Sequence, residues 1–337
     1  MKVINRAFLA GFVALLPAVC LAHVKWFVDF DTTKPPLSLQ GTLSAPLFWQ
    51  LLILSTLVIL ATSILDRKIP DFASRAGISE FFEKVNPWVP KLMRFGTSLF
   101  FLVLAIGYPK IILTPELVSD NPYLRYVHLA IAITAFSWRT SFVAGIGIIL
   151  VYAYAVDKYG MFHMLDYIVF IATGAYLINE TVIKGAPANK LIEFVRFALC
   201  SCLAWGAIEK FAHPQLFFDL LATHTYITLG FDWTLVVMAA GFVEFCCAYH
   251  LYTGKTASFG AAAVLAFFFF IAIIPFGFID LVGHFLFIIP LVAIVLTPRQ
   301  FKPSFNSIVN AGVFVVAVFA YMLVAYGAFY VTHRHLP

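Results

Sequence analysis

Long apolar runs alternate with short polar segments from Pro46 almost to the end of the chain. Most runs approach the roughly 20 residues that a membrane-spanning helix requires. The pattern predicts an all-α, polytopic membrane helical bundle of about ten transmembrane helices. The predicted spans are 46–65, 95–113, 123–138, 141–156, 162–179, 191–208, 233–252, 257–275, 278–297 and 306–330. Composition agrees, because 62% of the residues are hydrophobic and only 12% are charged, outside the usual range of soluble domains.

The first residues have the features of a secretory signal peptide. Lys2 and Arg6 precede an apolar stretch from Ala7 to Val19, and the small residue Ala22 follows. Cleavage after Ala22 would make His23 the first residue of the mature protein, and an uncleaved first helix is the alternative. Segment 23–45 would then lie outside the membrane, ahead of the first span.

The charges between the spans indicate an orientation. With the mature N-terminus outside, the inner segments carry thirteen Lys and Arg and the outer segments seven. That bias agrees with the positive-inside rule. We therefore expect a multi-pass protein of the bacterial inner membrane with both mature termini in the periplasm. The inner loop 66–94 is expected to contain a short surface helix from Ile78 to Val85.

The spans form two similar groups, which predicts an internal repeat of two parallel four-helix units. Arg94-Phe95 opens the unit 94–180, as Arg196-Phe197 opens the unit 191–297. Lys110 takes the place of Lys210, and His163/Asp166 that of Asp280/His284. The remaining segments are a first helix with its inner loop (46–93), a cytoplasmic connector (181–190) and a last helix with a periplasmic tail (298–337).

Candidate catalytic residues concentrate in the second unit. Glu244 has no basic residue within one helical turn, so inside a membrane it must find a partner or stay protonated. Proton handling or contact with a quinone is the functional interpretation, and a hydrogen bond to Lys210 or Tyr249 is the structural alternative. Glu209 and Lys210 are adjacent and do not face each other in a helix, so each is expected to reach a neighbouring helix.

Two Asp–His combinations share helix faces. Asp280 and His284 are four residues apart, and His163 and Asp166 are three apart, so either pair can interact. Such a pair can hold an imidazole in one tautomer for proton transfer or metal binding. The alternative is a structural pair at a helix end.

Metal binding is a separate hypothesis. A mature N-terminal His23 would offer an amine and an imidazole to copper or zinc, and His213 and His224 lie on the same predicted side. The alternative is an ordinary N-terminal residue. Trp26 is interpreted as a residue of the aromatic belt at the membrane surface. The four cysteines outside the signal peptide have no metal-binding spacing and are interpreted as small buried hydrophobes.

The second unit resembles the DoxX/DoxD-like family of four-helix membrane proteins. The resemblance covers about a hundred residues and is carried by short motifs, which are Arg196-Phe197, Trp205-Gly-Ala-Ile-Glu-Lys-Phe211, Gly241-Phe-Val-Glu244, Leu251-Tyr-Thr-Gly-Lys255 and Asp280-Leu-Val-Gly-His284. The first unit is similar only in outline and has no counterpart of Glu244. Some members of the family are subunits of thiosulfate:quinone oxidoreductases, and others associate with thiol-redox systems.

Three functions are compatible with these patterns. The first is a redox subunit that links a small sulfur or thiol reductant, or a periplasmic protein, to membrane quinone. The second is periplasmic copper or zinc binding, delivery or transport, and the third is an assembly or scaffold subunit of a membrane complex. The lipid bilayer is the expected surrounding. Nucleic acid is not an expected partner, because the basic residues follow the loops between apolar runs.

Overall fold

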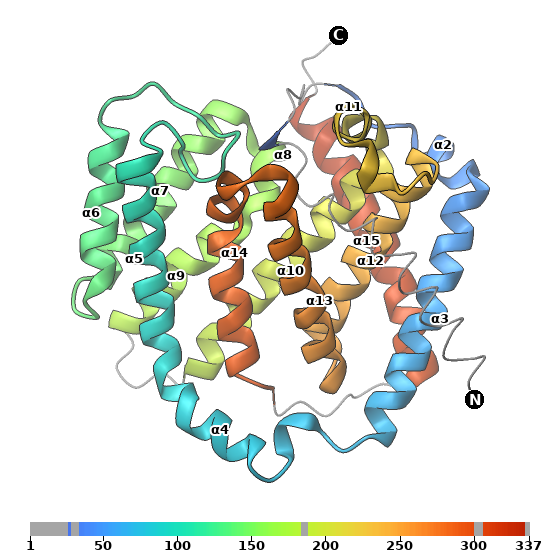
Figure 1. Cartoon of the computed structure of the whole chain (residues 1–337), viewed down its shortest axis with the longest axis horizontal. Coiled ribbons are helices and arrows are strands. Elements are labelled where there is room, and N and C mark those ends of the chain that lie inside the picture. Colours follow the sequence, from blue (N-terminus) through green and yellow to red (C-terminus); the bar gives the residue numbers. More distant parts are fainter. Residues whose placement is uncertain (1–25, 28–33, 183–187, 300–305, 334–337) are drawn as a thin grey trace.

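The described part of the chain is a bundle of helices that run roughly parallel to one another (Figure 1). The computed structural model describes residues 26–27, 34–182, 188–299 and 306–333. Within these ranges nine helices are long and apolar enough to cross a membrane. Each overlaps one of nine predicted spans, and the tenth predicted span, 123–138, overlaps the thirteen-residue helix α6 (Leu124–Phe136). The protein is therefore a multi-pass membrane protein.

Two groups of four helices make up most of the bundle. The first group comprises α5 (Val89–Gly107), α6, α7 (Ser141–Tyr159) and α9 (Ile168–Val182). The short helices α8 (Met161–Met164) and η5 (Leu165–Tyr167) precede α9. The second group comprises α10 (Ala188–Ala212), α12 (Trp233–Thr253), α13 (Thr256–Phe276) and α14 (Phe278–Leu296). Three short helices, η6 (Pro214–Phe217), α11 (Phe218–Thr223) and η7 (Thr225–Thr228), connect α10 to α12.

The helices of each group pack in the same cyclic order. The first helix contacts the second, the second the third, the third the fourth, and the fourth closes on the first. The groups meet through α5 against α14 and α9 against α10. The first helix of each group thus contacts the fourth helix of the other, which is the arrangement expected about a two-fold axis between them.

An arginine holds one end of each group together. Arg94 on α5 pairs with Glu180 on α9 (3.0 Å) and donates to the carbonyl oxygen of Phe136 at the end of α6 (3.4 Å). Arg196 on α10 donates to the carbonyl oxygen of Leu251 on α12 (3.3 Å), and also to those of Ile294 (3.4 Å) and Thr297 (3.0 Å) at the end of α14. In both groups the arginine therefore joins the ends of the second and fourth helices to the first.

Two long helices flank the second group. α3 (Pro46–Lys68) and α15 (Ser307–Thr332) pack against each other, and α3 also contacts α12. The Asp66 carboxylate of α3 accepts hydrogen bonds from the backbone N–H groups of Lys255 and Ala257 (2.8 Å each) at the start of α13. Helices α2 (Leu39–Ser44), η3 (Phe72–Ser74), α4 (Ile78–Val85) and η4 (Asn86–Trp88) complete the described elements, and α4 matches the predicted surface helix.

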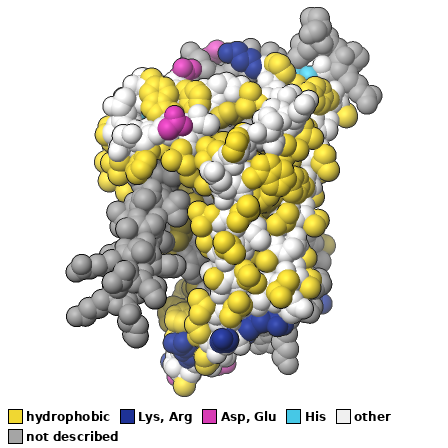
Figure 2. All heavy atoms as spheres, turned by 90° about the vertical axis from the view of Figure 1, so that its right-hand side faces the viewer, with side chains coloured by type: hydrophobic (Ala, Val, Ile, Leu, Met, Phe, Trp, Pro, Cys, Tyr) yellow, Lys and Arg dark blue, Asp and Glu magenta, His cyan; other side chains and the backbone are white. Residues whose placement is uncertain are grey.

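One end of the bundle is rich in basic residues, and we call it the basic end. It carries Arg67, Lys91, Arg94, Arg196 and Arg299, and Lys and Arg gather at the lower edge in Figure 2 while apolar side chains cover the face above. The opposite end, which we call the histidine end, carries His163, His213, His224, His284 and His333.

The helix that corresponds to the predicted span 95–113 begins and ends earlier than predicted. α5 begins at Val89 and ends at Gly107, and Pro109 lies in the following loop.

Close packing of α7 on α9 depends on glycine. A Cβ atom at Gly145 would lie 2.3 Å from the Gly174 carbonyl oxygen, and one at Gly174 would lie 2.8 Å from the Gly145 carbonyl oxygen. Small residues allow such close contact of helices in membranes, where packing is a main source of association energy.

We expect Gly145→Ala to lower stability by about 1–3 kcal/mol, because the new methyl group forces α7 away from α9. Unfolding of the purified protein in detergent measures the effect. The control is Gly312→Ala on α15, where a Cβ atom meets nothing within 4 Å. Equal unfolding curves for the two variants would contradict the proposed role of Gly145.

Candidate functional site

A buried ion pair lies between α10 and α12. The Lys210 Nζ atom is 2.6 Å from Glu244 Oε2, and the two side chains are 4% and 12% exposed. Lys210 also donates to the Gly206 carbonyl oxygen (3.3 Å). Gly241 permits this contact, because a Cβ atom there would lie 2.6 Å from the Phe211 ring and 2.9 Å from the Ala207 carbonyl oxygen. The helices therefore approach closely at Gly241, one turn before Glu244.

A second carboxylate enters this region from the first group. Gly206 lies between Asp166 and Glu244, since a Cβ atom there would be 3.6 Å from an oxygen of each. Asp166 is on η5, which packs on α10. Asp166 and His284 both interact electrostatically with Glu244. The ion pair of the second group thus lies beside an acidic residue of the first.

The predicted Asp280–His284 pair forms in the first turns of α14. His284 Nδ1 lies 3.0 Å from Asp280 Oδ2, and neither side chain is exposed. The His284 ring is enclosed by Trp26 (ring centroids 4.5 Å apart) and Phe269 (4.6 Å). Gly283 makes room for the indole, because a Cβ atom there would be 2.3 Å from a Trp26 ring atom.

Trp26 joins this pair to the first group. Its indole Nε1 donates to the Tyr167 hydroxyl (3.1 Å), and Tyr167 in turn donates to the Glu116 carboxylate. Glu116 also lies 3.5 Å from His163 Nε2. Trp26 and Tyr167 are buried, at 7% and 0% exposed. A continuous polar chain therefore runs from His163 through Glu116 and Tyr167 to the indole that covers His284.

His163 lies 3.5 Å from the Glu116 carboxylate, and Asp166 borders Gly206, and the sequence predicted neither contact. Two other predictions are corrected. Trp26 is not a belt residue, because it is buried between the two groups. Lys110 does not mirror Lys210, since it is exposed and pairs with Asp120 in the loop after α5 (2.8 Å).

Glu209 and Lys210 point in different directions, as predicted for neighbours in a helix. Lys210 reaches Glu244 on α12, the partner named as the structural alternative. Glu209 accepts a hydrogen bond from Trp205 Nε1 (3.2 Å) on the same helix. The sequence analysis did not predict a role for Glu116 or Tyr167. The four-residue spacing of His163 and Tyr167 could have indicated that these two side chains lie close together.

In the described part of the chain, the proposed metal ligands His213 and His224 do not belong to a cluster of metal-binding side chains. His213 is buried beside Phe329, with ring centroids 6.2 Å apart, and His224 contacts the rings of Tyr226 and Phe276. No group of three or more His, Cys, Asp or Glu residues in the described ranges could hold a metal ion. His23 lies outside these ranges.

Four carboxylates lie in this buried region, and they belong to Glu116, Asp166, Glu244 and Asp280. Lys210 pairs with Glu244, while His163 and His284 lie beside Glu116 and Asp280. Ionisable side chains are costly at membrane depth and commonly face the interior of a bundle, as they do here.

Comparisons with known proteins give no relative for the chain, since no family model, curated protein or solved structure matches it.

We expect Lys210→Met to destabilise the protein by about 3–5 kcal/mol, because Glu244 loses its cation in a buried position. The double variant Lys210→Met/Glu244→Gln should recover most of that loss, because no uncompensated charge remains. Denaturant unfolding in detergent compares the two variants. Additive losses in the double variant would show that the two side chains do not act as a pair.

Proposed function

We propose that this chain is a DoxX-like protein of the bacterial inner membrane that moves protons during quinone-linked oxidation of a small sulfur compound or thiol. The observation that carries the proposal is the Lys210–Glu244 pair within the membrane-spanning bundle, with Asp166 and Glu244 both bordering Gly206. Ionisable residues inside membrane bundles are costly and commonly mark proton or ion pathways.

The proposal includes an internal repeat. The matching cyclic order of helices and the matching contacts of Arg94 and Arg196 support two parallel four-helix units. The short motifs of the second unit that resemble the DoxX/DoxD-like family include Glu209, Lys210, Glu244, Asp280 and His284, which lie in or next to the buried core. The basic end would face the cytoplasm and the histidine end the periplasm.

Proton balance gives the core its role. Oxidation of two thiosulfate ions forms one S–S bond and gives tetrathionate and two electrons. A quinone that accepts the two electrons must also take up two protons to become a quinol. Oxidation of two thiols to a disulfide releases two protons, which balances that uptake. Glu244, supported by Lys210 and Asp166, is the proposed donor group, and Asp280–His284 and Glu116–His163 are the proposed relays.

We expect Glu244→Gln to lower thiosulfate- or thiol-driven quinone reduction about 100-fold, the range of a lost general acid. The assay follows reduction of a short-chain quinone by purified protein. Glu180→Gln is a matched control, because it removes a carboxylate from the other interhelical ion pair, at the basic end. An unchanged rate in Glu244→Gln removes that residue from the mechanism, and absence of quinone reduction by the wild-type protein refutes the function itself.

Copper or zinc binding at the mature N-terminus is a second candidate function. Trp26 is buried against His284, and three extended residues from Trp26 can reach at most about 10 Å. Asp280 Oδ1 is buried and has no hydrogen-bond partner among the described residues. An amine and imidazole at position 23 would therefore be within reach of an acidic, histidine-containing region.

For this second function we expect about one copper or zinc ion per mature chain by elemental analysis, and loss of that ion in His23→Ala. The N-terminus is first established by mass spectrometry. His250→Gln, at the basic end, serves as the control and should retain the ion. A metal-free wild-type protein, or an ion retained in His23→Ala, rejects this function.

A further inference from the structure

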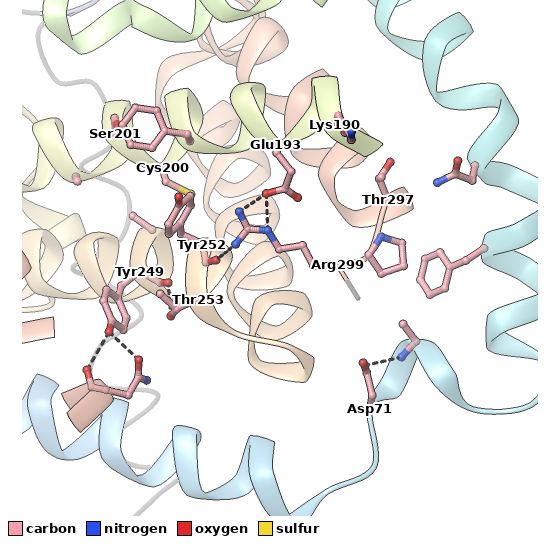
Figure 3. A pocket seen from close by; sticks show the side chains of 18 of the residues that line it. Asp71, Lys190, Glu193, Cys200, Ser201, Tyr249, Tyr252, Thr253, Thr297 and Arg299 are labelled. Carbon is pink, nitrogen blue, oxygen red and sulfur yellow. Dashed lines mark hydrogen bonds and ion pairs between the residues drawn. The ribbon is translucent and has the colours of Figure 1, made fainter. Parts of the chain in front are cut away.

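A large cavity opens at the basic end, away from the buried ionisable core. Its volume is about 1350 Å³, and its walls come from α10, α12, α15 and the segment around α4 (Figure 3). The volume exceeds that of most small-molecule sites, which measure about 300–1,000 Å³. Protein interiors are usually closely packed, so a space of this size among the described residues is a candidate binding site.

Two hydroxyl contacts define the inner limit of the cavity. The Ser201 and Tyr321 hydroxyls hydrogen-bond each other (2.9 Å) and join α10 to α15. The Tyr249 hydroxyl donates to Asn310 Oδ1 (2.8 Å) and joins α12 to α15. These hydroxyl and amide groups form hydrogen bonds with one another, so few polar atoms inside the cavity are left to bind a ligand. An apolar occupant suits this region.

The walls between these contacts are apolar and include small residues. Ala204, Ala248 and Ala317 line the space, and their side chains leave it unfilled. Phe197 on α10 and Val313 on α15 also line it, and they are 48% and 36% exposed. The cavity wall therefore presents accessible apolar surface, which suits a hydrocarbon chain.

The mouth of the cavity carries charges of both signs. Glu193 pairs with both Arg299 and Arg196, and one carboxylate with two guanidinium groups leaves this cluster with a net positive charge. Lys190, in the first turn of α10, is exposed and forms no ion pair with a described residue. Asp71 and Glu83 belong to the η3–α4 segment, and Figure 3 shows Asp71 far from Lys190 across the view. Among the described residues, the α10 side of the mouth is therefore positive, through Lys190 and the Arg196–Glu193–Arg299 cluster, and the η3–α4 segment supplies two carboxylates.

We propose that this cavity binds one phospholipid with a zwitterionic, primary-amine headgroup of the phosphoethanolamine class. Its phosphate would contact Lys190 at the α10 N-terminus, where backbone N–H groups also favour anions. Its ammonium, with three hydrogen-bond donors, would contact Asp71 and Glu83. An acyl chain would fill the space along Ala204, Ala248 and Ala317. A purely anionic headgroup fits less well, because it would face the two carboxylates.

The test uses a phosphatidylethanolamine that carries a diazirine in one acyl chain. The full-length protein in detergent is labelled by light, and mass spectrometry locates the label. We expect labelled peptides from α10, α12 and α15, and at least a ten-fold loss of label in Ala317→Trp, whose indole fills the cavity. The matched control is Val316→Trp, the adjacent residue on the lipid-facing side of α15 (67% exposed), which should keep the label.

Competition identifies the headgroup. Unlabelled phosphatidylethanolamine should displace the probe better than phosphatidylglycerol, and Glu83→Gln should reduce that preference by about ten-fold or more, as expected for one charge-assisted hydrogen bond. Equal competition by both lipids rejects headgroup recognition. Label outside these helices, or equal label in the two Trp variants, rejects the site. Displacement by a short-chain quinone alone would assign the cavity to quinone instead. Quinone reduction is measured separately, so either proposal can fail without the other.

Discussion

The cost of placing ionisable side chains inside an apolar bundle governs the organisation of this protein. Lys210 and Glu244 are tolerable at membrane depth only when they are in contact, because each would otherwise remain as an uncompensated buried charge. That contact requires α10 and α12 to approach within reach of a Lys–Glu pair. Gly241 provides the approach, since a Cβ atom at that position would collide with Phe211 and the Ala207 backbone. Packing and electrostatics at this contact therefore depend on each other.

The general architecture could be predicted from the sequence, because a membrane restricts what the chain can do. Backbone groups must be satisfied within each span, so long apolar runs become helices. The start and end of α4 and the helical character of all ten spans follow from this pattern. Helix limits near prolines and glycines were less predictable. α5 ends at Gly107 although apolar residues continue to Leu113, because Pro109 cannot continue the helix and the loop around Ile111 packs back into the core.

Contacts within one helix were easier to predict than contacts between helices. The Asp280–His284 pair follows directly from a four-residue spacing. For His163 and Asp166 the three-residue spacing crosses the boundary between α8, which ends at Met164, and η5, so the two residues do not share one regular helix. Glu116 and Trp26 lie in segments without helical periodicity, and their roles depend on tertiary packing around Tyr167. No local pattern in the sequence places them beside His163 or His284.

The buried core belongs to the interface between the two groups and not to one four-helix unit. The second group supplies Lys210, Glu244, Asp280 and His284, and the first supplies Glu116, His163 and Asp166. The sequence favoured the second unit, because only that unit has a residue like Glu244. In the structure, Asp166 of the first group and Glu244 of the second both border Gly206, where the two groups meet. The two groups therefore have similar arginine contacts at the basic end and different polar contacts at the histidine end. An isolated second unit would lack Glu116, His163 and Asp166, so the polar contacts of this core depend on both groups.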